Sequence, residues 1–140
     1  SSYADRCEKL HICYDVKLAL PETPIPNYEM CIILGNLLEN AVEAAQPVGA
    51  AHPVGAARQS KTDSRIELVV QTQGTHLAIM VKNNYSGELT LADGKPVSAK
   101  KDSGFGLRSV RAVAARYDGE VITEWDKETF KTYVMLSMNN

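Results

Sequence analysis

The most informative stretch of this sequence is Asn36-Leu37-Leu38-Glu39-Asn40-Ala41-Val42-Glu43-Ala44-Ala45. Four apolar residues in and just before it recur at spacings of four, three and four, which places them on one side of an α-helix. They are Leu34, Leu38, Ala41 and Ala45. The helical pattern starts at Asn27 and ends by Pro47. The stretch therefore predicts an amphipathic helix that packs on a core.

Polar side chains occupy the opposite face of this predicted helix. Asn36, Asn40 and Glu43 follow one another at i, i+4 and i+7. Asparagine carbonyls are hard oxygen donors that suit Mg²⁺, which usually shares a few protein oxygens with substrate phosphates. Asn40 is the better metal candidate of the two asparagines. The alternative is that both amides are solvated or cap neighbouring backbone.

A glycine-rich turn forms the second motif. Gly104-Phe105-Gly106-Leu107 directly precedes a helix that is predicted to run to about Tyr117. Glycines let the backbone approach an anion, and a helix N-terminus offers N–H groups with a positive dipole end. Lys100 and Lys101 before the turn and Arg108 after it favour phosphate over an ordinary helix-entry turn or a solvated charge cluster.

The remaining patterns predict strands and two loops. Alternation over 12–20 indicates one strand, 65–72 and 76–83 form a hairpin around Gly74, and two more strands lie near 120–125 and 130–138. Helices and antiparallel strands in separate groups favour an α+β layered sandwich.

The two loops differ in kind. Residues 46–57 are nearly a six-residue segment repeated, so 46–64 is predicted to be a flexible loop without catalytic residues. The polar segment 84–103 is long enough to suggest a lid. Residues 1–10 are interpreted as a linker or the end of a preceding helix.

Composition excludes several classes of protein. The 140 residues fit one domain, and a net charge of −2 argues against nucleic acid as a partner. Three cysteines match no zinc or disulfide pattern and indicate a reducing compartment. No apolar run approaches the roughly 20 residues of a membrane span.

In this order, the two motifs resemble the N box and G2 box of the GHKL nucleotide-binding family, over about 12–138. This family includes histidine kinases, gyrase-type topoisomerases, a heat-shock chaperone and mismatch-repair ATPases. The resemblance implies a two-layer α/β sandwich, with a mixed, mostly antiparallel sheet covered on one face by helices. It divides the chain into the remnant 1–10 and an ATP-binding catalytic domain 11–140 with an ATP lid at 86–103.

The resemblance also implies the site. ATP and Mg²⁺ are the expected cofactors, Asn36 and Asn40 the catalytic pair, and Asn40 the metal ligand. ATP-hydrolysing members carry a water-activating glutamate at the place of Asn36, so its absence favours phosphotransfer. The nucleotide-binding set is Asn36, Asn40, Glu43, Asn83, Tyr85, Gly87, Lys100, Lys101, Gly104, Phe105, Gly106, Leu107 and Arg108.

Two departures from the family pattern matter. The G1 box, normally Asp-x-Gly-x-Gly, here is Asn83-Asn84-Tyr85-Ser86-Gly87, which keeps only the last glycine. An asparagine carbonyl can still accept from the adenine amino group, although more weakly. The same change and the following Leu-Arg-Ser-Val-Arg segment resemble peptide-pheromone receptor kinases. Many histidine kinases have a basic residue at the place of Glu43, which is therefore expected to face solvent or bind Mg²⁺ through water.

The function implied is the catalytic domain of a sensor histidine kinase. None of His11, His52 and His76 lies on a long helix before an acidic residue, so the phosphoacceptor is expected on a separate dimerisation domain. The resemblance also implies a downstream response regulator and a homodimeric parent protein anchored in the bacterial inner membrane. This part of the parent is then expected in the cytoplasm. The alternatives are an anti-sigma-factor-type serine kinase and a nucleotide-sensing module without turnover.

Overall fold

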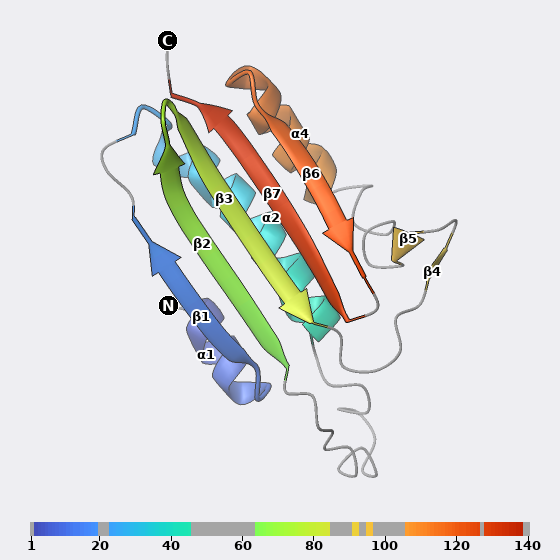
Figure 1. Cartoon of the computed structure of the whole chain (residues 1–140). Coiled ribbons are helices and arrows are strands. Elements are labelled where there is room, and N and C mark those ends of the chain that lie inside the picture. The colour runs from blue at the N-terminus through green and yellow to red at the C-terminus, as the bar shows by residue number, and fades with distance from the viewer. Residues whose placement is uncertain are drawn as a thin grey trace, which may run out of the picture.

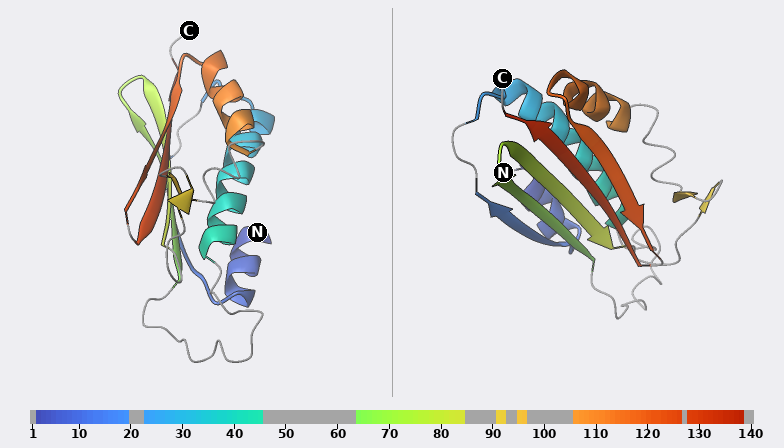
Figure 2. Two further views of the ribbon diagram at one scale, coloured as in Figure 1. Left: turned by 90° about the vertical axis from the view of Figure 1, so that its right-hand side faces the viewer. Right: turned by 45° about the horizontal axis from the view of Figure 1, so that its top comes forward.

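The computed structural model describes residues 2–19, 23–45, 64–84, 91–92, 95–96, 106–126 and 128–138. Within these residues three helices lie on one face of a five-stranded sheet (Figures 1 and 2). The helices are α1 (Ser2–Lys9), α2 (Asn27–Ala45) and α4 (Gly106–Arg116). The sheet strands are β1 (Cys13–Leu18), β2 (Arg65–Gln73), β3 (His76–Asn84), β6 (Glu120–Trp125) and β7 (Thr129–Ser137). The α+β two-layer prediction is confirmed.

The sheet is mixed and mostly antiparallel, as expected. Its strand order is β1-β2-β3-β7-β6, in which only β1 and β2 pair in parallel. Helix α2 connects these two parallel strands. Gly74 adopts φ +65° in the turn between β2 and β3, a conformation that glycine reaches at little cost.

Strict alternation along β3 and β7 builds the core. Every second residue is buried toward the helices, and Val70, Ile79 and Val134, which are directly paired neighbours on β2, β3 and β7, are fully buried. Ile33 of α2 and Val110 of α4 are also fully buried in the hydrophobic core. Of the helical stripe predicted from the sequence, Leu38, Ala41 and Ala45 are buried in the core, and Leu34 packs partly buried against it.

Two segments show detail that the sequence patterns did not give. Within residues 1–10, interpreted as a linker or the end of a preceding helix, helix α1 spans eight residues, and its Cys7 is buried in the core. The segment predicted as a lid contains two short paired strands, β4 (Leu91–Ala92) and β5 (Lys95–Pro96). The loop 46–64 lies outside the described residues except for Ser64, whose carbonyl accepts a 2.8 Å hydrogen bond from the Cys13 amide. No helix in the described part of the chain has the length and apolarity needed to cross a membrane.

Candidate functional site

Helix α2 presents three different faces to its surroundings. At 100° per residue, the buried residues centred on Leu37 and Ala41 form the core face. Glu29, Asn36 and Asn40 are separated by seven and four residues and so lie within about 40° of one another on a second face. Gly35 and Glu39 define a third face, roughly 100° round the helix from the asparagines.

Helix α1 occupies the third face. The Tyr3 hydroxyl donates to the Gly35 carbonyl at 3.2 Å, and Arg6 Nη1 pairs with Glu39 Oε2 at 2.6 Å. Arg6, and its hydrogen bond first of all, holds the pKa of Glu39 below its ordinary value. Both charged side chains are about half exposed, so solvent screens the pair and its contribution to stability is small. Glu39 is therefore bound to α1 and turned away from the asparagines.

The two asparagines lie on the face toward α4, and both are half-buried. Asn36 Nδ2 donates to the Ile32 carbonyl one turn earlier at 2.7 Å. Because this bond engages the amide nitrogen, the carbonyl oxygen of Asn36 is left as its acceptor. Asn40 follows one turn later on the same face, so two amides are aligned along the helix.

A buried carboxylate joins α2 to α4. The Glu29 side chain is 4% exposed. Its Oε2 accepts from Arg116 Nε at 2.8 Å and lies 2.6 Å from Nη2, and its Oε1 accepts from the Tyr117 hydroxyl. The Tyr117 hydroxyl, followed by Arg116, holds the pKa of Glu29 below its ordinary value. The carboxylate is therefore ionised at neutral pH and connects the start of α2 to the end of α4.

This junction fixes where α4 begins. The two helices lie side by side, and the contact between the start of one and the end of the other makes them antiparallel (Figure 2). Gly106 is ten residues before Arg116, which at 1.5 Å per residue is about 15 Å along α4. The same length along α2 leads from Glu29 to Glu39. The N-terminus of α4 consequently lies about level with Asn36 and Asn40.

Asn83 lies at the end of β3, which Figure 1 shows beside the C-terminal half of α2. Its side chain is on the helix-facing side of the sheet and only 3% exposed. Asn83 Nδ2 donates to the Asn84 carbonyl at 3.2 Å, which leaves its own Oδ1 to accept. Asn84 is turned to the other side of the sheet, where its Oδ1 accepts from the Arg65 amide at 2.7 Å.

Of the other predicted residues, three are described by the structure. Leu107 is buried in the core, so only its backbone could reach a ligand, whereas Arg108 and Glu43 are exposed. The remaining predicted contacts lie outside the described residues. They are Tyr85, Gly87, Lys100, Lys101, Gly104 and Phe105.

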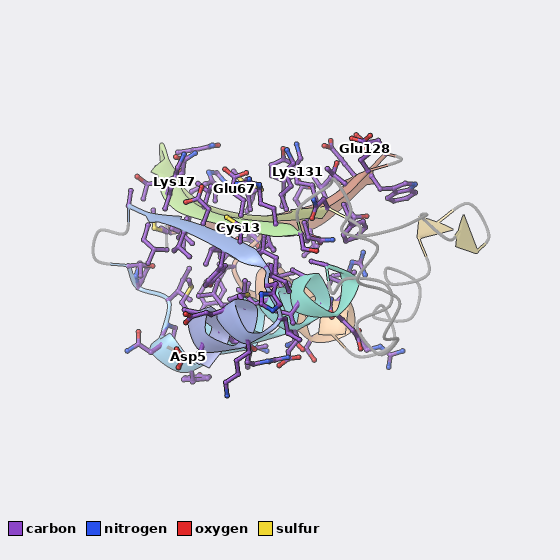
Figure 3. The ribbon with its side chains drawn as sticks, turned by 90° about the horizontal axis from the view of Figure 1, so that it is seen from below. Asp5, Cys13, Lys17, Glu67, Glu128 and Lys131 are labelled. Atoms are coloured by element: carbon purple, nitrogen blue, oxygen red, sulfur yellow. The ribbon has the colours of Figure 1, made fainter. Side chains whose placement is uncertain are left out.

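The opposite face of the sheet has a different character. Glu67 and Lys131 project from it, and Glu128 lies at its edge, as Figure 3 shows. A hollow of about 210 Å³ on this face is lined by Arg65, Glu67, Lys82, Asn84, Glu128 and Thr129. Its lining mixes both signs of charge on exposed strands. It lacks the aligned amides and the helix N-terminus, so the candidate site is on the helical side.

The sequence alone did not identify Glu29 and its partners. An acid in the first turn of a helix, and Arg116 in the last turn of another, are what helix dipoles favour on any surface. Eighty-seven residues separate Glu29 from Arg116, and nothing in the local pattern shows that these two meet.

Comparison with known proteins gives a family and a fold. A family model described as "GHKL domain" matches residues 26–137. No curated protein matches the sequence.

Three solved structures superpose on nearly the whole chain. The Acinetobacter baumannii histidine kinase AdeS aligns with a TM-score of 0.69 at 13% identity, covering 99% of this chain and 60% of that one. A catalytic domain of histidine kinase ThkA gives 0.69 at 16% identity, with 98% and 85% covered. A histidine kinase domain from an Erythrobacter litoralis blue-light activated kinase gives 0.70 at 11%, with 98% and 56% covered. The chain thus spans less than two thirds of the first and third structures, and the likeness establishes the fold.

Proposed function

The chain belongs to the GHKL domain family, and from this premise we propose that it is the ATP-binding catalytic domain of a sensor histidine kinase. It would bind Mg·ATP and present the γ-phosphoryl group to a histidine on a dimerisation domain of the parent protein. The observation that carries the proposal is that Asn36 and Asn40 lie on one face of α2, level with the N-terminus of α4.

The residues present fit the chemistry of magnesium and a triphosphate. Among the described residues no three His, Cys, Asp or Glu side chains form a metal-binding group. A site made of Asn36 and Asn40 carbonyl oxygens would therefore depend on phosphate oxygens and water for its other ligands, which is how Mg²⁺ is commonly held. When bound, the metal supplies positive charge against the phosphates.

The proposal assigns roles to Asn36, Asn40, Asn83 and the start of α4. Asn40 holds the metal, and Asn36, with its amide nitrogen bonded to the Ile32 carbonyl, contributes its carbonyl oxygen. Backbone N–H groups at the start of α4 bind phosphate. Asn83 accepts from the adenine amino group, since its side chain lies on the helical side of the sheet, whereas that of Asn84 lies on the other side. Catalysis then comes from positioning and charge neutralisation.

Three finer assignments belong to the same proposal. The altered G1 segment from Asn83 suggests the peptide-pheromone receptor type of kinase. A response regulator would receive the phosphoryl group from the parent homodimer. The parent would be anchored in the bacterial inner membrane with this domain on the cytoplasmic side. The likeness of the fold to histidine kinase structures supports this setting.

Calorimetric titration of the chain with ATP tests the proposal. We expect saturable binding that weakens strongly when EDTA removes magnesium, because the asparagine oxygens bind phosphates through the metal. Absence of binding at millimolar Mg·ATP would exclude the kinase assignment and favour a module that has lost its nucleotide.

Asn83→Asp should tighten adenine binding. A carboxylate accepts a hydrogen bond from the amino group more strongly than an amide carbonyl, so we expect the Kd of Mg·ATP to fall by about threefold to tenfold. GTP, which lacks that amino group, is the matched control and should not gain. Equal gains for ATP and GTP, or no change for either, would show that Asn83 does not contact the base.

A further inference from the structure

The Glu29 junction places a charged group where an apolar contact would serve packing equally well. Burying a carboxylate is costly, and replacing a buried ion pair with well-packed apolar residues is often neutral or stabilising. Arg116 is half exposed, so solvent weakens its attraction for the buried acid. Stability alone is therefore a weak reason for Glu29.

The buried side chains of α4 form no directional bonds that would fix its axial position. All of them are aliphatic, and packed helices are known to shift by one turn past a neighbouring element. These side chains are Leu107, Val110, Val113 and Ala114. Directional hydrogen bonds to both carboxylate oxygens remove this freedom, because a shift of one turn moves the partners by about 5.4 Å.

We propose that Glu29 is a positioning residue for the candidate nucleotide site, acting through Arg116 and Tyr117 to set the register of α4 against α2. Glu29 shares its helix face with Asn36 and Asn40. The junction at one end of α4 thereby determines how the N-terminus at the other end, about 15 Å away, faces the two amides. This inference rests on the proposed function for the nature of the ligand.

The test compares a triphosphate with a nucleoside. Adenosine depends on the end of β3, whereas the phosphates of Mg·ATP also depend on the register of α4. In Glu29→Gln we expect the Kd of Mg·ATP to rise by about fivefold to twentyfold while that of adenosine changes less than about twofold. NMR titrations at a temperature well below the unfolding transition give both values. Tyr117→Phe removes one hydrogen bond and should give a smaller change of the same kind.

A core variant on a strand away from those that α4 contacts is the matched control. Val70→Ala removes fully buried volume on β2, which β3 separates from β7, whereas α4 contacts β7 and β6. It should weaken the fold while changing the Kd of Mg·ATP and that of adenosine to the same extent. Equal losses for Mg·ATP and adenosine in Glu29→Gln, or the same selective loss in Val70→Ala, would reduce Glu29 to a structural residue.

Hydrogen exchange in the ligand-free protein gives an independent answer. The amides of residues 110–113, the first in α4 whose N–H groups bond to carbonyls of the helix itself, should exchange faster in Glu29→Gln than in Val70→Ala, because the N-terminal half of α4 loses its fixed position. Unchanged exchange there would contradict the inference. If the wild-type chain does not bind Mg·ATP, the proposed function fails, and exchange still decides whether Glu29 fixes α4.

Discussion

Asn40→Ala should abolish most of the affinity for Mg·ATP, with the Kd rising by at least about tenfold, or 1.4 kcal/mol. The Asn40 carbonyl is the proposed metal ligand on the face of α2 toward α4, and alanine offers no oxygen there. The part of the ATP affinity that depends on magnesium should disappear while the remainder survives. Calorimetry with and without EDTA measures both parts.

Asn27→Ala is the matched control for this variant. Asn27 is the exposed first residue of the same helix, about 20 Å along the axis from Asn40. Both substitutions remove one amide from one helix, and neither empties the core. Thermal unfolding should change little in either case. If the two variants change the Kd of Mg·ATP by similar factors, Asn40 is not the metal ligand.

Gly119→Ala should produce the largest loss of stability among single methyl additions at the glycines whose surroundings the structure describes. A Cβ at this position would lie 1.9 Å from the Met135 carbonyl oxygen and 3.2 Å from that of Ala114. Both atoms belong to backbone, so neither can swing aside. We expect a cost of at least about 3 kcal/mol and a Tm lower by roughly 10 °C or more.

The position of Gly119 explains this lack of space. The Gly119 amide donates to the Ala114 carbonyl at 2.8 Å and the Asp118 amide to that of Ala115 at 3.3 Å, which is the Schellman arrangement at a helix end. Glu120 then pairs with Met135 as β6 begins. The chain thus turns from α4 into the sheet directly over β7, and a methyl group must separate the two.

Gly74→Ala provides the comparison. Gly74 has φ +65°, but a Cβ added there would have nothing within 4 Å, so alanine meets only backbone strain of about 1–2 kcal/mol. Differential scanning calorimetry of both variants separates crowding from conformation. A Gly119→Ala protein no less stable than Gly74→Ala would mean that β7 moves away from the end of α4 easily.

Local sequence patterns predicted much of the fold. The spacing of Leu34, Leu38, Ala41 and Ala45 predicted α2, and alternation with Gly74 between two strands predicted the β2–β3 hairpin. Edges were less well defined. The strand expected over 12–20 ends at Leu18, and its side chains are mostly exposed. It lies at the edge of the sheet, where a strand pairs with only one neighbour and its sequence can carry fewer buried apolar residues.

The asparagines of α2 could be selected from sequence because their spacing follows from helix geometry alone. The same geometry could not tell which neighbour each face meets. The structure shows that Glu39, within the same motif, pairs with Arg6 of α1. Asn36 and Asn40 lie on the helix face of Glu29, which binds Arg116 at the end of α4. It also shows that Asn83, and not Asn84, faces the helical side.

By itself, the sequence determined the elements, the helical stripe and the set of amides and glycines that points to a nucleotide, since these depend on periods of 3.6 and two residues. Only the tertiary structure revealed the contact of Glu29 with Arg116 and Tyr117, and with it the level at which α4 begins beside α2. The reason is that hydrogen bonds between residues far apart in the chain depend on how whole elements pack, which no local period encodes.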